Sequence, residues 1–401
     1  MTAIIKGQNF GDLYRTVHED TMIDMLMLEG HANSSDTQAA RLDSQAALNL
    51  ACEAGLSTRL DDQGRRLFDP VEVMCRLKSA EAIAGSDFWA RRMVPTLQQF
   101  VADLDAAGDA QVSVSYRRTF DTSRVPPETA LRLRMPLPLQ GRYEKLDIDL
   151  DLPPEVISHR LSDGRLEVRA GSSESKEISV GVKLDFRLTQ NGDLAPPPAD
   201  DIYLRPKEGL IVRTDRVSAL ARRLAGTARP DEAVRAFWNY IIDELAFMPI
   251  HYDQVPLDAP LDWVLDTGNY DCQLASALFV ALCRTQGIPG RMVGGNFLYR
   301  RSPTNHYWAE IWLENSGWTS FDFISWDLSK GGEDSLWRDR FYGRIDARLI
   351  MECLPQSFIG AIGLPIPPVW HILRTIEGNG ARIRLVGVDN VTVYQDHIAV
   401  H

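Results

Sequence analysis

The sequence predicts an α+β protein with several domains, because its hydrophobic period changes twice along the chain. Apolar residues recur about every 3.6 positions over residues 36–106, as in amphipathic helices. From residue 111 to about 190 they alternate with polar residues, which indicates strands with one side facing solvent. The helical period then returns and is followed by further strands. A chain of 401 residues is long enough for two or three domains, each with its own core.

Residues 1–109 are predicted to form a helical N-terminal region. Asp36 is placed to cap a helix that stops near Gly55. Asp69-Pro70 has the cap-and-proline pattern of a second helix start, and a third helix carries the apolar residues between positions 93 and 104. We expect this region to act as a helical cap or packing unit.

Residues 110–190 are predicted to form a β-sandwich-like domain. Four alternating runs begin at Val112, Leu131, Leu146 and Ile178. Turn residues such as Asp163-Gly164 separate them. Asn191-Gly192 and three consecutive prolines then mark a stiff linker over residues 191–204, which leaves residues 205–401 as the last domain.

The last domain contains a cysteine, a histidine and an acid in a suggestive order. Cys272 opens a helix-like apolar run, His306 begins a strand, and Asp322 lies near the end of the next strand. These are the parts of a thiol nucleophile with an oriented base. A helix N-terminus and a nearby imidazolium would both stabilise a thiolate, so we expect the pKa of Cys272 to be lowered.

The two strands that carry His306 and Asp322 are expected to form a hairpin. If its loop is centred near Asn315, His306 lies across from Ile324, and Asp322 is its diagonal neighbour on the same face. The acid can then hold one imidazole nitrogen while the other nitrogen faces the thiol.

Four motifs resemble the transglutaminase-like superfamily, whose catalytic core is papain-like. They are Asn269-Tyr270-Asp271-Cys272, the segment from Arg284 to Gly295 (RTQGIPGRMVGG), His306-Tyr307-Trp308-Ala309-Glu310, and Gly317-Trp318-Thr319-Ser320-Phe321-Asp322. The resemblance is specific over about 260 to 325 and looser from about 205. It implies a bacterial-type multidomain member with Cys272 as nucleophile, His306 as base and Asp322 as orienting acid. It also implies a thioester intermediate that water or an amine resolves.

Two positions depart from the usual pattern of this superfamily. Asp271 precedes the cysteine where glycine is common, and Phe323 follows the acid where proline is frequent. A carboxylate beside the nucleophile opposes thiolate formation unless its side chain points away.

The surroundings of the cysteine offer candidates for further roles. The backbone N–H of Cys272 is the expected first oxyanion donor. The resemblance suggests a second donor from an upstream aromatic or amide side chain, for which Trp263 and Tyr252 are candidates by position. Trp308 and Trp318 are expected to belong either to the core or to the walls of a substrate cleft.

Composition limits the partners. The net charge of −12 weighs against nucleic acid or an anionic membrane as the main partner. Neither a signal peptide nor a membrane-spanning helix is evident, so a cytoplasmic location is expected. Five widely spaced cysteines are expected to be reduced, without metal-ligand spacing, and neither a metal nor a cofactor is predicted. The oligomeric state stays open.

The sequence therefore predicts a cysteine enzyme that acts on a small-molecule or peptide substrate with an amide or acyl group. Hydrolysis of an amide or peptide-like bond is the first hypothesis. Acyl transfer to an amine is an alternative that an apolar tunnel excluding water would favour. A non-catalytic binding or scaffold module with the same fold is a second alternative.

Overall fold

The computed structural model describes most of the chain. The described residues are 16–31, 37–78, 93–107, 111–123, 125–126, 129–162, 164–171, 176–188, 197, 201–300, 303–353, 371–377, 380–386 and 394–401. Helices and strands occur in separate regions as well as together, and the predicted α+β class is confirmed. Most of the predicted linker 191–204 lies outside the described residues.

The N-terminal region is mainly helical. Its elements are β1 (Val17–His18), α2 (Glu19–His31), α3 (Thr37–Glu53), β2 (Arg59–Leu60), β3 (Arg66–Phe68), α4 (Pro70–Lys78) and α5 (Val94–Ala107). The predicted start at Asp69-Pro70 is confirmed, because the Asp69 side chain accepts the Val71 backbone N–H at 3.0 Å. Helix α3 ends just before Gly55, as predicted, whereas its expected cap, Asp36, lies outside the described residues.

Residues after position 111 form two facing sheets. Their strands are β4 (Val112–Asp121), β5 (Ala130–Pro136), β6 (Tyr143–Asp151), β7 (Val156–Ser162), β8 (Arg165–Gly171) and β9 (Glu177–Leu188). The alternation in β4 is confirmed, because Val114, Tyr116 and Phe120 are all buried. One sheet has the order β5-β8-β7, and β4, β9 and β6 belong to the other. The two sheets share one apolar core, so this unit is a sandwich.

The C-terminal strands complete this sandwich. They are β18 (His371–Glu377), β19 (Gly380–Val386) and β20 (Tyr394–Val400), and the larger sheet has the order β18-β19-β20-β4-β9-β6. From the sequence we predicted that these strands belong to the last domain, 205–401. This prediction is wrong, because Val400 of β20 pairs with Val114 of β4 in the sandwich. The physical reason is that β20 satisfies the backbone groups of β4, which would otherwise form a sheet edge.

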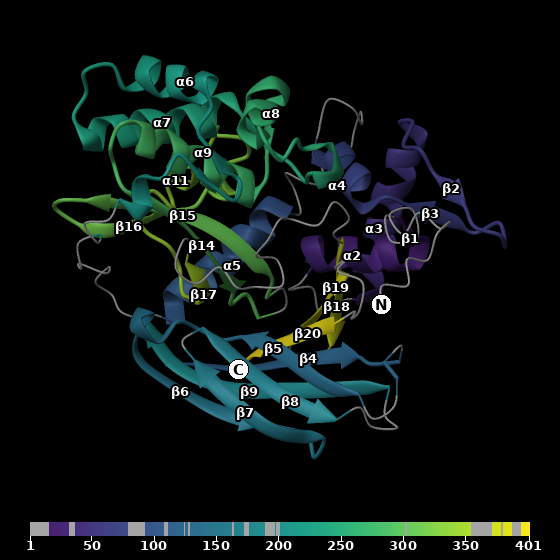
Figure 1. Ribbon diagram of the computed structural model, residues 1–401. Helices are drawn as coiled ribbons and strands as arrows, with labels where there is room; N and C mark the ends of the chain where they lie inside the picture. Colours follow the sequence, from purple (N-terminus) through teal and green to yellow (C-terminus); the bar gives the residue numbers. More distant parts are fainter. Residues whose placement is uncertain are drawn as a thin grey trace.

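The segment between the linker and residue 353 forms a helical layer on a four-stranded sheet. Its elements are η4 (Ile202–Leu204), β10 (Lys207–Glu208), β11 (Ile211–Val212), α6 (Asp215–Ala225), α7 (Pro230–Glu244), β12 (Ala246–Phe247), η5 (Tyr252–Gln254), α8 (Pro260–Thr267), β13 (Asn269–Tyr270), α9 (Cys272–Thr285), β14 (Gly290–Phe297), β15 (Asn305–Leu313), β16 (Gly317–Phe321), α10 (Ser325–Leu328), α11 (Ser335–Arg338) and β17 (Arg348–Cys353). The antiparallel sheet has the order β16-β15-β14-β17, and α9 packs on β14 and β15. Figure 1 shows the helices α6 to α9 on one side of this sheet and the sandwich on the other.

The sandwich and the four-stranded sheet share a core. Val293, Trp308 and Leu349 pack in the same apolar cluster as Leu184 of the sandwich. Tyr143 adds a polar link, because its hydroxyl accepts the Ile350 backbone N–H at 2.6 Å. The sandwich and the four-stranded sheet are therefore packed against each other and are not separate domains joined only by a linker.

A buried ionic cluster joins the same two units. Glu310 of β15 is fully buried and binds both Arg142, between β5 and β6, and Arg291 of β14. Burial alone would raise the pKa of Glu310, but the two guanidinium groups lower it to about 2. The carboxylate is therefore ionised and compensated within the protein.

Candidate active site

Cys272 is the first residue of α9, as the sequence predicted. Asp271 caps the helix, accepting the backbone N–H groups of Gln273 at 3.1 Å and Leu274 at 2.9 Å. The rest of the helix is almost entirely buried, which fixes its position against the sheet. Cys272 itself is half-buried and lines a cavity of about 320 Å³.

The hairpin that carries the histidine and the acid has the predicted register. Ala309 pairs with Phe321 and Leu313 with Gly317, which centres the turn at Asn315. Regular pairing stops at Phe321, and the Asp322 backbone N–H turns to the Phe341 carbonyl at 3.2 Å. The structure thus places Asp322 at the end of the hairpin, next to the first residues of β15.

His306 and Asp322 are in direct contact. The Nε2 atom of His306 lies 2.9 Å from both carboxylate oxygens, and both side chains are buried. The imidazole also stacks on Phe297, with 4.2 Å between ring centroids, which limits its rotation. Because Nε2 is used by the acid, Nδ1 is the nitrogen left for the cavity.

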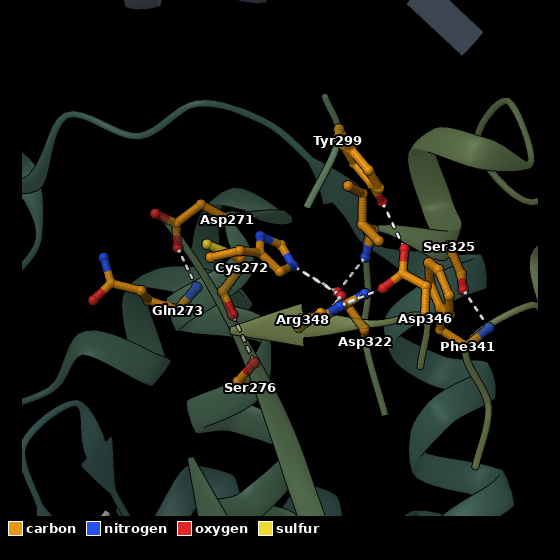
Figure 2. Close-up of polar contacts among 12 residues, drawn as sticks. Asp271, Cys272, Gln273, Ser276, Tyr299, Asp322, Ser325, Phe341, Asp346 and Arg348 are labelled. Carbon is orange, nitrogen blue, oxygen red and sulfur yellow. Dashed lines mark hydrogen bonds and ion pairs between the residues drawn. The ribbon is translucent and has the colours of Figure 1, made fainter. Parts of the chain in front are cut away.

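Cys272 lies beside the start of β15. The Tyr307 backbone amide, one residue after His306, hydrogen-bonds to the thiol, and both Cys272 and His306 line the same cavity. The structure therefore brings the three predicted residues to one place. Figure 2 shows Cys272 at the start of α9 and Asp322 across from it.

The acid is held by a second partner that the sequence analysis missed. Arg348 of β17 donates from Nη1 to Asp322 and from Nε to Asp346 at 2.6 Å, and Tyr299 donates to Asp346 at 3.1 Å (Figure 2). Arg348 is fully buried among aromatic rings, among them Phe297 and Trp308. Its only sequence signal is a charged residue directly before three apolar residues of the strand.

Gly295 allows β17 to approach this group. It lies opposite His306 in β14, and a Cβ atom there would stand 1.8 Å from the Leu349 carbonyl oxygen. Any side chain would push β17 away. Since Arg348 precedes Leu349, the close approach helps to bring the guanidinium to Asp322.

A comparison with family models identifies this part of the chain. Residues 218–323 match the model described as the Transglutaminase-like superfamily. The chain contains a transglutaminase-like domain. The predicted resemblance is therefore confirmed, and the matched segment includes Cys272, His306 and Asp322. Domains of this kind usually carry Cys-His-Asp enzymes.

Comparisons with whole proteins give distant similarities. A solved structure of a candidate cysteine protease from Cytophaga hutchinsonii is 13% identical, with a TM-score of 0.43 over 73% of this chain and 97% of that chain. The periplasmic domain of TgpA from Pseudomonas aeruginosa is 19% identical, with a TM-score of 0.32 over 56% of this chain and 94% of that chain. No curated protein matches the chain.

The resting charge state of the transglutaminase-like site differs from the expected one. Burial raises the pKa of the Cys272 thiol well above its ordinary value, and the neighbouring Asp271 carboxylate raises it further. Burial lowers the pKa of His306, although Asp322 opposes this. The expectation of a lowered thiol pKa is therefore corrected. Both shifts favour a neutral thiol and a neutral imidazole in the resting site.

Backbone N–H groups of Gln273 and Tyr307 lower the pKa of the Cys272 thiol, but burial and the Asp271 carboxylate outweigh them. The Asp271 side chain occupies the N–H groups at the helix start and also accepts the Tyr252 hydroxyl at 2.8 Å. Tyr252 lines the cavity, but its single proton is directed to Asp271. The candidate role of Tyr252 as oxyanion donor is therefore not supported by this arrangement.

Replacing Asp271 by asparagine is expected to speed alkylation of Cys272. Asparagine caps helices as well as aspartate does, so the helix start is retained while the negative charge is lost. We expect the iodoacetamide labelling rate at pH 7 to rise about tenfold, as for a decrease of one unit in the thiol pKa. Mass spectrometry of the Cys272 peptide measures this rate. Asp334→Asn, which changes the cap of α11, is the matched control and should leave the rate unchanged.

The three tryptophans proposed for the site lie elsewhere in the domain. Trp263 of α8 is half-buried against the helical core and is not among the described lining residues of the cavity. Trp308 is fully buried beside Arg348, and Trp318 packs against Tyr203. Trp308 and Trp318 thus follow the core alternative, and neither borders the cavity.

Gln273 is a polar lining residue that the sequence analysis overlooked. It is only 1% exposed, borders the cavity, and its Nε2 atom has no hydrogen-bond partner in the described part of the chain. A buried amide donor without a partner is costly unless something else binds it. The sequence feature that could have indicated a role for Gln273 is its position directly after Cys272.

Other features bear on cofactors and membranes. Among the described residues, Asp69, Glu72 and His251 form one group whose ligand atoms lie within 4.8 Å of one another, as a metal ion would require. Asp69 already caps α4 and lies 3.2 Å from His251 Nε2. Within the described ranges, no helix is both long and apolar enough to cross a membrane.

Proposed function

We propose that the protein catalyses cysteine-dependent acyl chemistry, with hydrolysis of an amide or peptide-like bond as its main outcome. Cys272 is the nucleophile, His306 the base and Asp322 the acid that orients the base. The observation that carries the proposal is the contact of His306 Nε2 with Asp322 at 2.9 Å, in a cavity that Cys272 also lines. This geometry directs the remaining imidazole nitrogen away from the acid and toward the cavity.

The first half of the reaction forms a thioester. As the Cys272 sulfur attacks the substrate carbonyl carbon, its proton passes to Nδ1 of His306. Transfer during the attack suits a thiol whose resting pKa is raised, because no thiolate needs to accumulate beforehand. The tetrahedral intermediate then collapses, the carbon–nitrogen bond breaks, and the leaving amine takes the proton from His306.

The second half releases the acyl group. His306 removes a proton from water, the hydroxide attacks the thioester carbonyl, and the sulfur–carbon bond breaks. The proton returns to the thiol and a carboxylic acid leaves. Asp322 stabilises the imidazolium form in both halves, since its pKa is lowered to about 2 and it remains ionised.

The developing oxyanion needs donors close to Cys272. The Cys272 backbone N–H is one donor in this proposal. The amide of Gln273 replaces Trp263 and Tyr252 as the second, because it borders the cavity and its nitrogen has no partner in the described structure.

Mass spectrometry of rapidly quenched mixtures tests the proposal. The full chain is mixed with a panel of acyl amides and thioesters, then acidified and digested. We expect an acyl mass on Cys272 that decays in water and gives the free acid. Product masses in the presence of ethylamine measure transfer to an amine against hydrolysis. Absence of any acyl mass on Cys272, with no turnover across the panel, would support the non-catalytic scaffold alternative.

The cytoplasmic location remains part of this proposal. It is supported by Cys52, Cys75, Cys272, Cys283 and Cys353, all of which are free thiols in the structure. Cell fractionation with an antibody to the full chain measures the location directly.

A further inference from the structure

The cavity at Cys272 has a second wall that comes from the N-terminal region. Six apolar side chains of α2, α4 and α5 line it: Met22, Met25, Pro70, Val71, Met74 and Leu97. None of them belongs to the matched segment 218–323. The volume of about 320 Å³ falls within the range of small-molecule sites, roughly 300–1,000 Å³. The N-terminal helices thus help to shape a pocket of ligand size.

A buried ion pair fixes this wall to the transglutaminase-like domain. Lys78 Nζ at the end of α4 donates to Asp327 of α10 at 2.7 Å and to the Phe247 carbonyl at 2.9 Å. The two charged side chains are 2% and 5% exposed. Gln98 of α5 adds a bond to the Leu328 carbonyl at 2.9 Å. Figure 1 shows α4 between the helices α2 and α3 and the α6–α9 layer. The N-terminal helices are therefore a fixed part of the pocket wall.

The charges that border the pocket are already compensated. Lys78 and Asp327 bind each other, and Asp271 binds the helix N-terminus and Tyr252. Among the described lining residues, no further charged side chain stands ready for an ionic group of a substrate. A carboxylate or ammonium group placed there would be buried without a partner. Methionine side chains adapt well to irregular apolar groups.

Polar atoms without partners in the described structure occur on residues that directly follow Cys272 or directly precede His306 in the chain. Besides Gln273 Nε2, they are Thr304 Oγ1 and Asn305 Oδ1, and all three residues border the pocket. An amide or ester group can bond both donors and acceptors of this kind. The pocket therefore has polar groups that adjoin the nucleophile and the base in the chain, and apolar groups from the N-terminal helices.

We propose that this pocket binds an uncharged aliphatic acyl chain of the substrate. The scissile carbonyl lies at Cys272 and Gln273, and the chain extends to the methionines of α2 and α4. This inference rests on the proposed function for its orientation. It makes the N-terminal helical region a specificity element of the enzyme.

Three p-nitrophenyl esters test the proposal. They are the acetyl ester, the hexanoyl ester and the monoester of adipic acid. Cys272 takes the acyl group, p-nitrophenol leaves with the proton, and water regenerates the thiol. We expect kcat/KM to rise by up to about fourfold for each methylene between the acetyl and hexanoyl esters. The adipoyl ester, which has the same chain length but a terminal carboxylate, should be roughly 100-fold poorer than the hexanoyl ester. Equal rates for these two esters would overturn the inference.

A charge placed in the wall should change this preference. Met74→Lys is expected to lower the hexanoyl-to-adipoyl ratio of kcat/KM at least tenfold, because the ammonium group pairs with the carboxylate and disfavours the apolar chain. Met27→Lys is the matched control: Met27 is half-buried on α2 but is not a lining residue. An unchanged ratio in a folded Met74→Lys protein, or an equal change in both variants, contradicts the inference.

Protection against alkylation separates failure of the pocket from failure of catalysis. Hexanamide is expected to slow iodoacetamide labelling of Cys272 in the unmodified protein, and adipamic acid at the same concentration is not. This difference without any Cys272-dependent turnover would support the pocket and contradict the proposed function. Turnover of all three esters at equal rates, with equal protection, would support the function and contradict the pocket. The measurement needs no variant, so it decides the matter even if Met74→Lys does not fold.

Discussion

Replacing Cys272 by alanine is expected to lower kcat for acyl turnover by about 10⁴- to 10⁶-fold, while the protein stays folded. The loss is large because the thioester cannot form and the remaining groups act as a unit with the nucleophile. Alanine at the first position of α9 keeps the helix and its Asp271 cap. Steady-state kinetics on the ester or amide panel measure the change, and circular dichroism monitors the fold.

Cys283→Ala provides the matched control for this variant. Cys283 lies on the same helix but is fully buried in the helical core and does not border the cavity. We expect kcat to stay within about threefold, with a modest loss of stability from the small void. A Cys272→Ala protein with unreduced activity would contradict the enzyme hypothesis.

Replacing Arg348 by methionine is expected to reduce kcat/KM about 100-fold and to shift its pH profile. The Asp322 and Asp346 carboxylates would be left buried without their shared cation, which also destabilises the fold by about 3–5 kcal/mol. Burial is the main cause of the lowered pKa of His306, and the positive charge of Arg348 lowers it further. Without Arg348 the pKa of His306 rises, so the acidic limb of the kcat/KM profile should move to higher pH.

Acid unfolding gives a second measure of Arg348. In the intact protein the pKa of Asp322 is about 2, below the unfolded value of about 3.9. Its contribution to stability is present above pH 3.9 and is lost as the pH falls through 2. Removing Arg348 should raise the folded pKa and shrink this acid-dependent contribution. Arg338→Met, which removes a guanidinium paired with Asp243 and Asp339 near the surface, should leave the pH profile of kcat/KM unchanged.

Local patterns were sufficient to predict much of the transglutaminase-like site. The start of α9 follows from a capping residue before an apolar run, and the hairpin register follows from its short turn. Both features depend on residues close together in sequence. They place Cys272 at a helix start and bring Asp322 to His306.

Contacts between distant segments could not be predicted from local patterns. Arg348 reaches Asp322 only because β17 pairs with β14 at Gly295, a pairing that no turn or period specifies. Trp308 and Trp318 are a second example. As aromatic residues near the predicted site they were candidates for cleft walls, but both are buried in the packed interior. Which side of the sheet becomes a cavity depends on the position of the N-terminal helices.

The departure at Asp271 acquired a physical meaning only in the structure. From the sequence it was a carboxylate that could oppose thiolate formation. Its bonds to Leu274 and Tyr252 show that it remains close to the cysteine and fixes both the helix start and one side of the pocket. Tyr252 was a candidate oxyanion donor by its position in the sequence, but its hydroxyl donates to Asp271 instead.

The pairing of Val400 with Val114 has a consequence for biosynthesis. During translation, β4 leaves the ribosome long before its partner β20 exists, and the whole transglutaminase-like domain is made in between. Until then one edge of the sandwich is open to other chains, and non-local closure of this kind is slow. The open edge of β4 is therefore exposed to aggregation until β20 has been made and pairs with it.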